Sequence, residues 1–304
     1  MKCAYVSCLA IAQLLCHFIY SQYYFSSNNR VEPEVLWEAG ISAGVMNCLT
    51  DIGGANGAGK KFIKDINWNQ VQAGVSLFAN ASWHYQFGIR FSVTAGHVSG
   101  SDAVLKNSSG VATNRYLRNL QFKTHIVEGS VAAELYPLMI FTDRNVSVLS
   151  PYLLAGIGGF YYSPKAWFNN HWVDLRSMHT EGEGFIEYPD RNAYGPITWC
   201  TPVGAGIRYD AAGLFNFRFE LVYRFTGTDY LDDVSKGYID ASVFNRHLPA
   251  NESLVASQLA DRSSELAQGV KHSANDIRGN PSNKDAWFSA MLSASVVLGR
   301  VRHK

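Results

Sequence analysis

The sequence predicts an all-β fold, an eight-stranded antiparallel transmembrane β-barrel with short periplasmic turns and long extracellular loops. Three observations support this prediction. Eight stretches alternate between apolar and polar residues with a period of two, the pattern of a strand with two different faces. The connections alternate between short turns and long loops. No run of about 18 apolar residues follows the N-terminal segment, which leaves a closed barrel as the way to cross a bilayer.

The longest alternating stretch covers residues 83–96. Its odd-numbered positions, from Trp83 to Ala95, are aromatic or aliphatic, and its even-numbered positions, including Arg90, are polar, small or charged. A strand needs roughly 9–11 tilted residues to cross a bilayer, and this stretch is longer. A long strand of a soluble sandwich is the alternative interpretation of this stretch taken alone.

The eight expected strands follow in chain order, and their connections favour the membrane barrel over the sandwich. The strands are residues 37–45, 71–77, 83–96, 127–135, 152–162, 203–209, 215–225 and 288–299. Short turns are expected at 80–82, 143–145 and 210–213, and long loops at about 50–68, 99–119, 163–196 and 227–284. Outer-membrane barrels place short turns on one rim and long loops on the other, whereas a soluble sandwich has no reason to sort its loops.

Residues 1–21 have the features of a secretory signal peptide. Lys2 supplies the positive start, residues 4–20 the apolar stretch, and Ser21 a small residue before a cut expected near Ser21–Gln22. Residues 22–304 are then expected to form one outer-membrane barrel domain. The formal net charge of +1 does not favour a nucleic-acid partner. Outside the first segment only Cys48 and Cys200 remain; a disulfide between them is left open, and two unpaired thiols are preferred.

The inward faces of the expected strands carry balanced charges. These residues are Glu38, Glu128, Glu134, Glu220, Arg90, Arg208, Arg218 and Arg224. Eight strands leave an interior that side chains fill, and buried charges are costly unless they are paired. We therefore expect an Arg–Glu network that plugs the lumen, with Gly88, Gly204 and Gly206 making room for the arginines. An ion path or a binding cavity inside the barrel is the alternative.

No constellation in the sequence indicates an enzyme, and no cofactor is expected. The histidines lack the i, i+4 spacing of a helical metal site, and Ser, His and Asp occur in no nucleophile motif. Residues 53–61 are glycine-rich like a phosphate-binding loop but lack the Gly-Lys-Ser/Thr ending. We interpret them as a flexible rim loop.

An acidic segment, residues 228–235, lies in the longest loop. Its carboxylates Asp229, Asp232 and Asp233, with Asp240 nearby, are weak candidates for binding a hard cation through oxygen ligands. A structural or partner-contact role is preferred, and it would include Tyr230. Residues 251–271 have helix-forming composition and predict a partly helical excursion in the same loop.

Several segments resemble the outer-membrane barrels of Bacteroidota typified by PorG of the type IX secretion system. The most specific are residues 228–235 and the Arg-Gly-Asn-Pro segment that starts at Arg278 and includes Asn280. The others are residues 118–122 followed by Glu128, and residues 151–160, 180–184 and 202–209. They occur in the expected order over nearly the whole mature chain.

The resemblance implies a non-enzymatic outer-membrane barrel that associates with a periplasmic ring made of a lipoprotein and a partner protein. The family's machine exports proteins and, in gliding bacteria, supports motility. The chain departs from common barrels because it ends in Arg302, His303 and Lys304 without a terminal aromatic residue. Since some family members have no assigned role, fold carries over better than function.

Three functions compete at this point. The first is a structural component of a secretion complex, and the second is a stand-alone surface barrel that binds an external ligand or partner through its long loops. The third is a barrel enzyme acting on lipids or peptides, which would need acid–base residues such as Asp232, Asp233 and His179 at one rim. The first is preferred.

Overall fold

The computed structural model describes residues 30–31, 35–53, 68–106, 110–141, 148–211, 215–298 and 301–302. The expected signal peptide, most of the glycine-rich segment and the expected turn at 143–145 lie outside the described residues.

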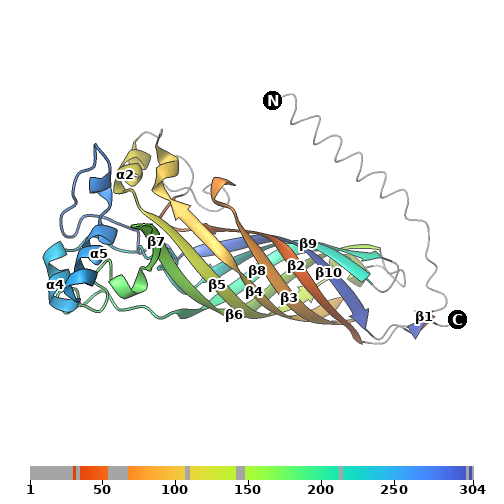
Figure 1. Cartoon of the computed structure of the whole chain (residues 1–304). Coiled ribbons are helices and arrows are strands. Elements are labelled where there is room, and N and C mark those ends of the chain that lie inside the picture. The colour runs from red at the N-terminus through yellow and green to blue at the C-terminus, as the bar shows by residue number, and fades with distance from the viewer. Residues whose placement is uncertain are drawn as a thin grey trace, which may run out of the picture.

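Eight antiparallel strands form a closed barrel (Figure 1), which confirms the predicted fold class. They are β2 (Val35–Leu49), β3 (Gln72–Trp83), β4 (Phe87–Ser101), β5 (Gln121–Leu135), β6 (Leu149–Phe168), β8 (Ile197–Ala211), β9 (Phe215–Thr226) and β10 (Ala286–Leu298). The sheet runs β5-β4-β3-β2-β10-β9-β8-β6, and a further pairing of β5 with β6 closes it. Among the described residues the barrel sheet therefore has no free edge, which suits a membrane-spanning fold.

The two faces of the strands separate as the alternation predicts. In β9, Phe215, Phe217 and Phe219 are about half exposed on the outer wall, while Arg218 and Glu220 between them are buried. The same division holds along β4, where Phe87, Ile89, Phe91 and Val93 lie outside. So extensive an apolar exterior suits the hydrocarbon core of a bilayer rather than water.

No helix among the described residues is long and apolar enough to cross a membrane.

The first short turn differs from the prediction. β3 continues to Trp83 and β4 begins at Phe87, so the turn lies at residues 84–86 instead of 80–82. His84 and Tyr85 adopt left-handed φ values of 49° and 58°, and Gln86 N donates to Trp83 O at 2.9 Å. Tyr85, expected on the outer face, is buried instead. The alternation continues through the turn by coincidence, because turn conformation does not depend on hydrophobic period.

The other two connections on this rim also differ in detail. Between β5 and β6 the chain forms α3 (Pro137–Phe141), so the connection over residues 136–148 is longer than the expected short turn. Between β8 and β9, residues 210 and 211 belong to β8, and the remainder of the expected turn lies outside the described residues. Beyond this rim, at the right-hand end of the barrel in Figure 1, the pair β1 (Arg30–Val31) and β11 (Val301–Arg302) forms a separate two-stranded sheet.

The opposite rim carries a folded layer that we call the loop cap, made of residues 50–53, 68–71, 102–106, 110–120, 169–196 and 227–285 (Figure 1). Its elements are η2 (Trp68–Gln70), η3 (Asp102–Leu105), α2 (Val111–Arg118), β7 (His171–Asp174), η4 (Arg176–Met178), η5 (Ala241–Val243), α4 (Phe244–His247), α5 (Ala250–Ala260) and η6 (Ser263–Glu265). The expected helix is confirmed in its first part by α5. β4 runs to Ser101 and β6 to Phe168, so two loops begin later than expected.

Candidate functional site in the lumen and the loop cap

A network of ion pairs fills the lumen toward the turn rim, and Glu134 of β5 is at its centre. Glu134 pairs with Arg218 of β9 at 3.0 Å and with Arg90 of β4. Arg218 also reaches Glu38 of β2 at 2.6 Å, and Arg90 reaches Glu220 of β9 at 2.5 Å. The two arginines each bridge two carboxylates from different walls of the barrel, so the network spans the interior.

Two buried tyrosines complete the hydrogen bonding of this network. Tyr152 OH donates to Glu220 Oε2 at 2.8 Å and accepts from Arg90 Nη2 at 3.2 Å. Tyr136 OH donates to Glu134 Oε2 at 2.5 Å. Buried carboxylates are stabilised only when such partners satisfy their remaining lone pairs.

The inward glycines make room for different residues than expected. A Cβ atom on Gly206 would lie 2.5 Å from Cζ of Tyr152. The nearest neighbours of Gly88 and Gly204 are likewise Asn80 and the β9 chain at Leu221 and Val222. The atoms nearest to these glycines thus belong to residues other than the arginines for which they were expected to make room. Gly206 contributes to the network indirectly. It leaves room for the ring of Tyr152, and the Tyr152 hydroxyl hydrogen-bonds with Arg90 and Glu220.

A second lumen pair lies nearer the loop cap. Arg224 Nε is 3.0 Å from Glu128 Oε2, and Nη1 of the same guanidinium donates to Ser289 Oγ at 2.5 Å. The guanidinium lies over the ring of Trp287 at 4.1 Å from its centroid. Trp287 is fully buried, so this stack closes the lumen below the cap.

Arg208 is the member of the expected network that the structure brings into no ion pair with a described residue. Its guanidinium lies over the ring of Tyr136 at 4.4 Å and near that of Tyr85 at 5.3 Å. Tyr85 reaches this place because it belongs to the turn rather than to the outer face of a strand. Cation–π contact takes the place of a carboxylate for this arginine.

The space left in the middle of the lumen is small. A cavity of about 20 Å³ lies between Arg90, Glu220 and Ser130. A water molecule needs roughly 10–15 Å³ of such space, so the cavity has room for about one. At this level of the lumen, side chains from several strands therefore leave room for about one water molecule.

In the loop cap, three segments far apart in sequence meet around Arg278. Arg278 Nη1 lies 3.1 Å from Glu181 Oε1 and donates to Asp233 O at 2.9 Å. Glu181 also accepts from the backbone nitrogens of Ser235 and Lys236. The three segments are those with residues 180–184, 228–235 and 278–281, all of which carry the family resemblance.

The carboxylates of the acidic segment are used to hold backbone and hydroxyl groups. Asp232 accepts from Ile52 N at 2.9 Å and from Val234 N at 3.0 Å. Asp229 accepts from Ser235 Oγ at 2.6 Å. Asp233, in a left-handed conformation with φ of 66°, accepts from Thr180 Oγ1 at 2.6 Å and from the Tyr194 hydroxyl. These contacts indicate a structural role.

The remaining candidate residues from the sequence also make defined contacts within the loop cap. Tyr230 stacks on Tyr194 with 4.5 Å between ring centroids. Asn280 N donates to Asp51 Oδ2 at 2.6 Å. Asp240 lies apart from the acidic segment's contacts and caps η5 by accepting from Ser242 N at 2.9 Å.

Several cap residues of equal structural importance were not among the site residues predicted from the sequence, although Arg118 falls in the resembling segment 118–122. Arg118 of α2 makes a two-pronged contact with Asp102, with Nε to Oδ2 at 2.8 Å and Nη2 to Oδ1 at 2.9 Å. Asp285 accepts from Leu231 N at 2.8 Å. These residues lie in long loops without periodicity, so only a turn or helix-end signal around Arg118 and Asn119 could have indicated them.

Burial shifts the titration of the acidic segment. Burial raises the pKa of Asp233 to about 7, although the nearby Arg278 opposes the shift. Burial likewise raises the pKa of Asp229 to about 7, against the hydrogen bond from Ser235. The pKa values of Asp232 and Asp285 are raised well above the usual range by burial and then by neighbouring carboxylates. The cap is therefore a place where protonation and folding are coupled.

Within the described ranges, no three His, Cys, Asp or Glu side chains gather as a metal site would require. Cys48 and Cys200 are both buried and unbonded to each other. His179 packs its ring against Phe185 at 5.4 Å between centroids, while Asp232 and Asp233 are engaged as described above.

A scan against protein-family models finds no match, and a search of curated proteins finds none either. Among solved structures, the chain is similar to Ail, the attachment invasion locus protein of Yersinia pestis, with 11% identity, 86% of this chain and 99% of that chain covered, and a TM-score of 0.35. It is also similar to the N-terminal β-barrel domain of Pseudomonas aeruginosa OprF, with 8% identity, 87% and 98% coverage, and a TM-score of 0.34. Neisserial surface protein A is similar as well, with 9% identity, 87% of this chain and 97% of that chain covered, and a TM-score of 0.36.

These likenesses are distant, and the class of protein is defined by the strand pairing and the interior of this chain itself. It is a closed eight-stranded barrel with an apolar exterior, a lumen filled by ion pairs and a folded loop cap.

Proposed function

We propose that this protein is a non-enzymatic barrel of the outer membrane of a Gram-negative bacterium, exported through its N-terminal signal peptide. We propose further that it is a structural component of a protein secretion complex. The observation that supports a structural role is the filled lumen, in which Arg218 joins Glu38 on one wall to Glu134 on another. A barrel blocked in this way serves as a membrane anchor rather than as the conduit itself.

The assignment to type IX secretion in Bacteroidota, with a connection to gliding motility, rests on the sequence resemblance. Under this proposal the short-turn rim faces the periplasm and contacts a ring of a lipoprotein and its partner. The loop cap then faces the outside. Residues 180–184, 228–235 and 278–281, which carry the resemblance, converge in one buried cluster of the cap.

The second candidate function is a stand-alone surface barrel that binds an external partner through its loops. The observation that favours it is that the loop cap is folded around a hydrophobic core of its own. Its helices pack around a core that includes Phe185, Phe244 and Ala256. A folded cap of this size provides a rigid surface for recognition.

A mild-detergent pull-down of a tagged copy from outer membranes, followed by mass spectrometry, tests the secretion proposal. Recovery of periplasmic lipoprotein and partner in fixed ratio is the expected result. Ile140→Glu on α3 at the turn rim should lower that recovery, and Leu254→Glu on α5 in the cap, a matched exposed apolar residue, should not. Recovery of the barrel alone, with export intact in a deletion strain, would reject the secretion role and leave the stand-alone function.

A further inference from the structure

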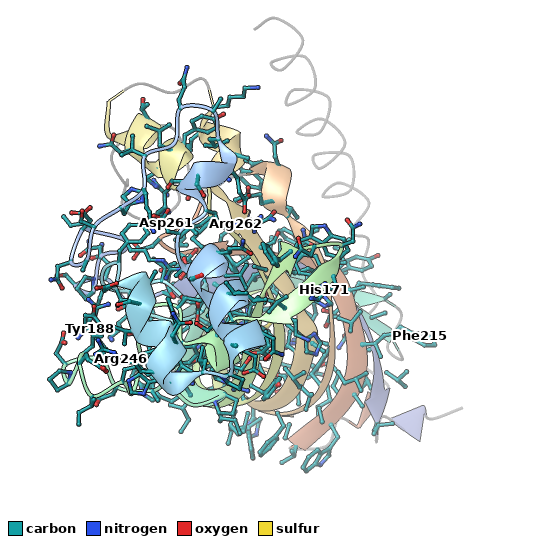
Figure 2. The ribbon with its side chains drawn as sticks, turned by 60° about the vertical axis from the view of Figure 1, so that its left-hand side comes forward. His171, Tyr188, Phe215, Arg246, Asp261 and Arg262 are labelled. Carbon is teal, nitrogen blue, oxygen red and sulfur yellow. The ribbon has the colours of Figure 1, made fainter. Side chains whose placement is uncertain are left out.

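An open cleft of about 540 Å³ lies in the loop cap, between the tip of the β6–β7 hairpin and the segment that follows α5. The residues that matter for its chemistry are Trp167, Asn169, Asn170, Gln258, Arg262 and Glu265. Figure 2 looks onto the capped end and shows Asp261 and Arg262 on the same end as His171 of β7. The volume lies within the range of roughly 300–1,000 Å³ that small-ligand sites occupy.

The walls of the cleft are held in place by the protein. Arg262 Nη1 donates to Trp167 O at 3.0 Å, and Gln121 Nε2 donates to the same oxygen at 3.2 Å. Asn169 and Asn170 form the hairpin tip with left-handed φ values of 45° and 64°. A site whose walls are fixed before binding loses less conformational entropy when a ligand enters.

The charged groups around the cleft are already matched within the protein. Arg262 Nε and Nη2 contact the two oxygens of Glu265 at 2.9 and 3.0 Å. Asp261 accepts from Ser263 N at 3.1 Å and from His272 N at 2.8 Å. Arg262 is thus already paired with Glu265, and the carboxylate of Asp261 already accepts hydrogen bonds, so the cleft favours an uncharged ligand.

The remaining lining combines exposed amides with aromatic surface. Asn169, Asn170 and Gln258 are exposed, and each amide offers both donors and acceptors. Trp167 is 41% exposed and is braced by Trp172, with 5.3 Å between ring centroids in an edge-to-face arrangement. Hydroxyl groups suit the amides, and the C–H faces of sugar rings suit an aromatic wall. We propose that this cleft binds a neutral oligosaccharide.

The proposal is independent of the secretion role, and binding to the full-length protein in detergent micelles tests it. Printed arrays of neutral, anionic and cationic oligosaccharides would identify a probe, and calorimetry with that neutral oligosaccharide would give its Kd. Saturable binding of neutral oligosaccharides is expected. Trp167→Ala should weaken binding by about tenfold or more, and Gln258→Ala by about fivefold, the effect of losing one hydrogen bond of about 1 kcal/mol.

Two matched variants serve as controls, Trp68→Ala and Gln268→Ala, which replace an exposed tryptophan and an exposed glutamine that do not line the cleft. Both should bind as the wild type does. Gln258→Ala lies on the surface of α5, so it keeps the test valid if Trp167→Ala fails to fold. A second arm uses nanodiscs with the strain's own lipopolysaccharide; saturable binding there distinguishes a membrane-linked saccharide from a free one.

Three outcomes would overturn the proposal. The first is no saturable binding of any neutral oligosaccharide in either arm. The second is binding that Trp167→Ala and Gln258→Ala leave unchanged. The third is that substitutions in the cleft abolish binding of a peptide but leave binding of the saccharide unchanged. That result would assign the cleft to a protein partner.

Discussion

Arg278 Nη1 lies 3.1 Å from Glu181 Oε1, a contact between residues separated by 97 positions in the chain. Both side chains are at least 97% buried. The same guanidinium donates to the carbonyl oxygens of Asp233 and Ala260, so it joins four segments of the loop cap. Arg278 is therefore a buried cation that links these segments of the cap, while the barrel has a separate network of its own.

Replacing this cation should loosen the cap and spare the barrel. Arg278→Met leaves Glu181 buried without a cationic partner, which typically costs about 3–5 kcal/mol. We expect limited proteolysis to cut the loops at least about tenfold faster, while the heat-unfolding midpoint of the barrel on gels stays unchanged. Arg246→Met, at an exposed surface pair with Glu187, is the control and should show wild-type proteolysis. Equal rates for both variants would contradict the assignment.

The stability of the cap should fall as pH rises through neutrality. Folding raises the pKa of Asp229 and Asp233 to about 7, whereas the pKa of an Asp in the unfolded chain is about 3.9. The folded cap thus binds more protons than the unfolded one between these values. The stabilisation is complete below pH of about 4 and is lost as pH rises through about 7. Hydrogen exchange of residues 228–235, corrected for intrinsic rates, measures it.

Two variants make the pH dependence specific. Asp233→Asn removes one titrating group and should flatten the dependence of protection on pH. Asp240→Asn is the control, because the hydrogen bond from Ser242 N lowers the pKa of Asp240, which lies outside the buried cluster. Protection that increases between pH 4 and 7 in the wild type would disprove the prediction.

The lumen network should contribute strongly to barrel stability. Glu134→Gln removes the carboxylate shared by Arg90 and Arg218 and leaves both cations short of a partner. We expect a loss of about 3–5 kcal/mol, seen as a lower heat-unfolding midpoint. Glu187→Gln on the cap surface is the matched control and should leave the midpoint unchanged. A wild-type midpoint for Glu134→Gln would show that the ion pairs are dispensable.

The barrel should not conduct ions unless its network is removed. Planar-bilayer recordings of the wild type are expected to show no stable current steps, because the central cavity of about 20 Å³ holds about one water. A triple variant with Arg90→Ser, Glu134→Ser and Arg218→Ser should show steps. Stable steps in the wild type would refute the plug, and their absence in a correctly folded triple variant would show that other side chains block the path.

The barrel could be predicted because period-two patterning reports directly on which face a residue takes. Phe217 and Arg218, for example, are assigned to opposite faces by position alone, and the structure agrees. The pattern does not record where a strand reverses. The turn at His84 and Tyr85 was missed because its left-handed φ values interrupt the strand without interrupting the alternation.

The loop cap was much less accessible from sequence. The resemblance identified segments containing Glu181, Asp233 and Arg278, but it could not indicate that they touch. A helix-end signal marks the region of Arg118, but nothing in the sequence indicates its contact with Asp102, because a loop's long-range partners follow from how it packs. The cleft beside Trp167 has the same origin, since its walls come from segments about 95 residues apart.

The lumen pairs also constrain the order in which this barrel can be completed. Arg218 comes from β9, and its partners Glu38 and Glu134 come from β2 and β5, which are 180 and 84 positions away in the chain. A sheet lacking its last strands would place these charges at an apolar boundary without their counterions, a costly state. Insertion into the bilayer is thereby coupled to closure, so partly assembled sheets are disfavoured and the barrel enters the membrane as a cooperative unit.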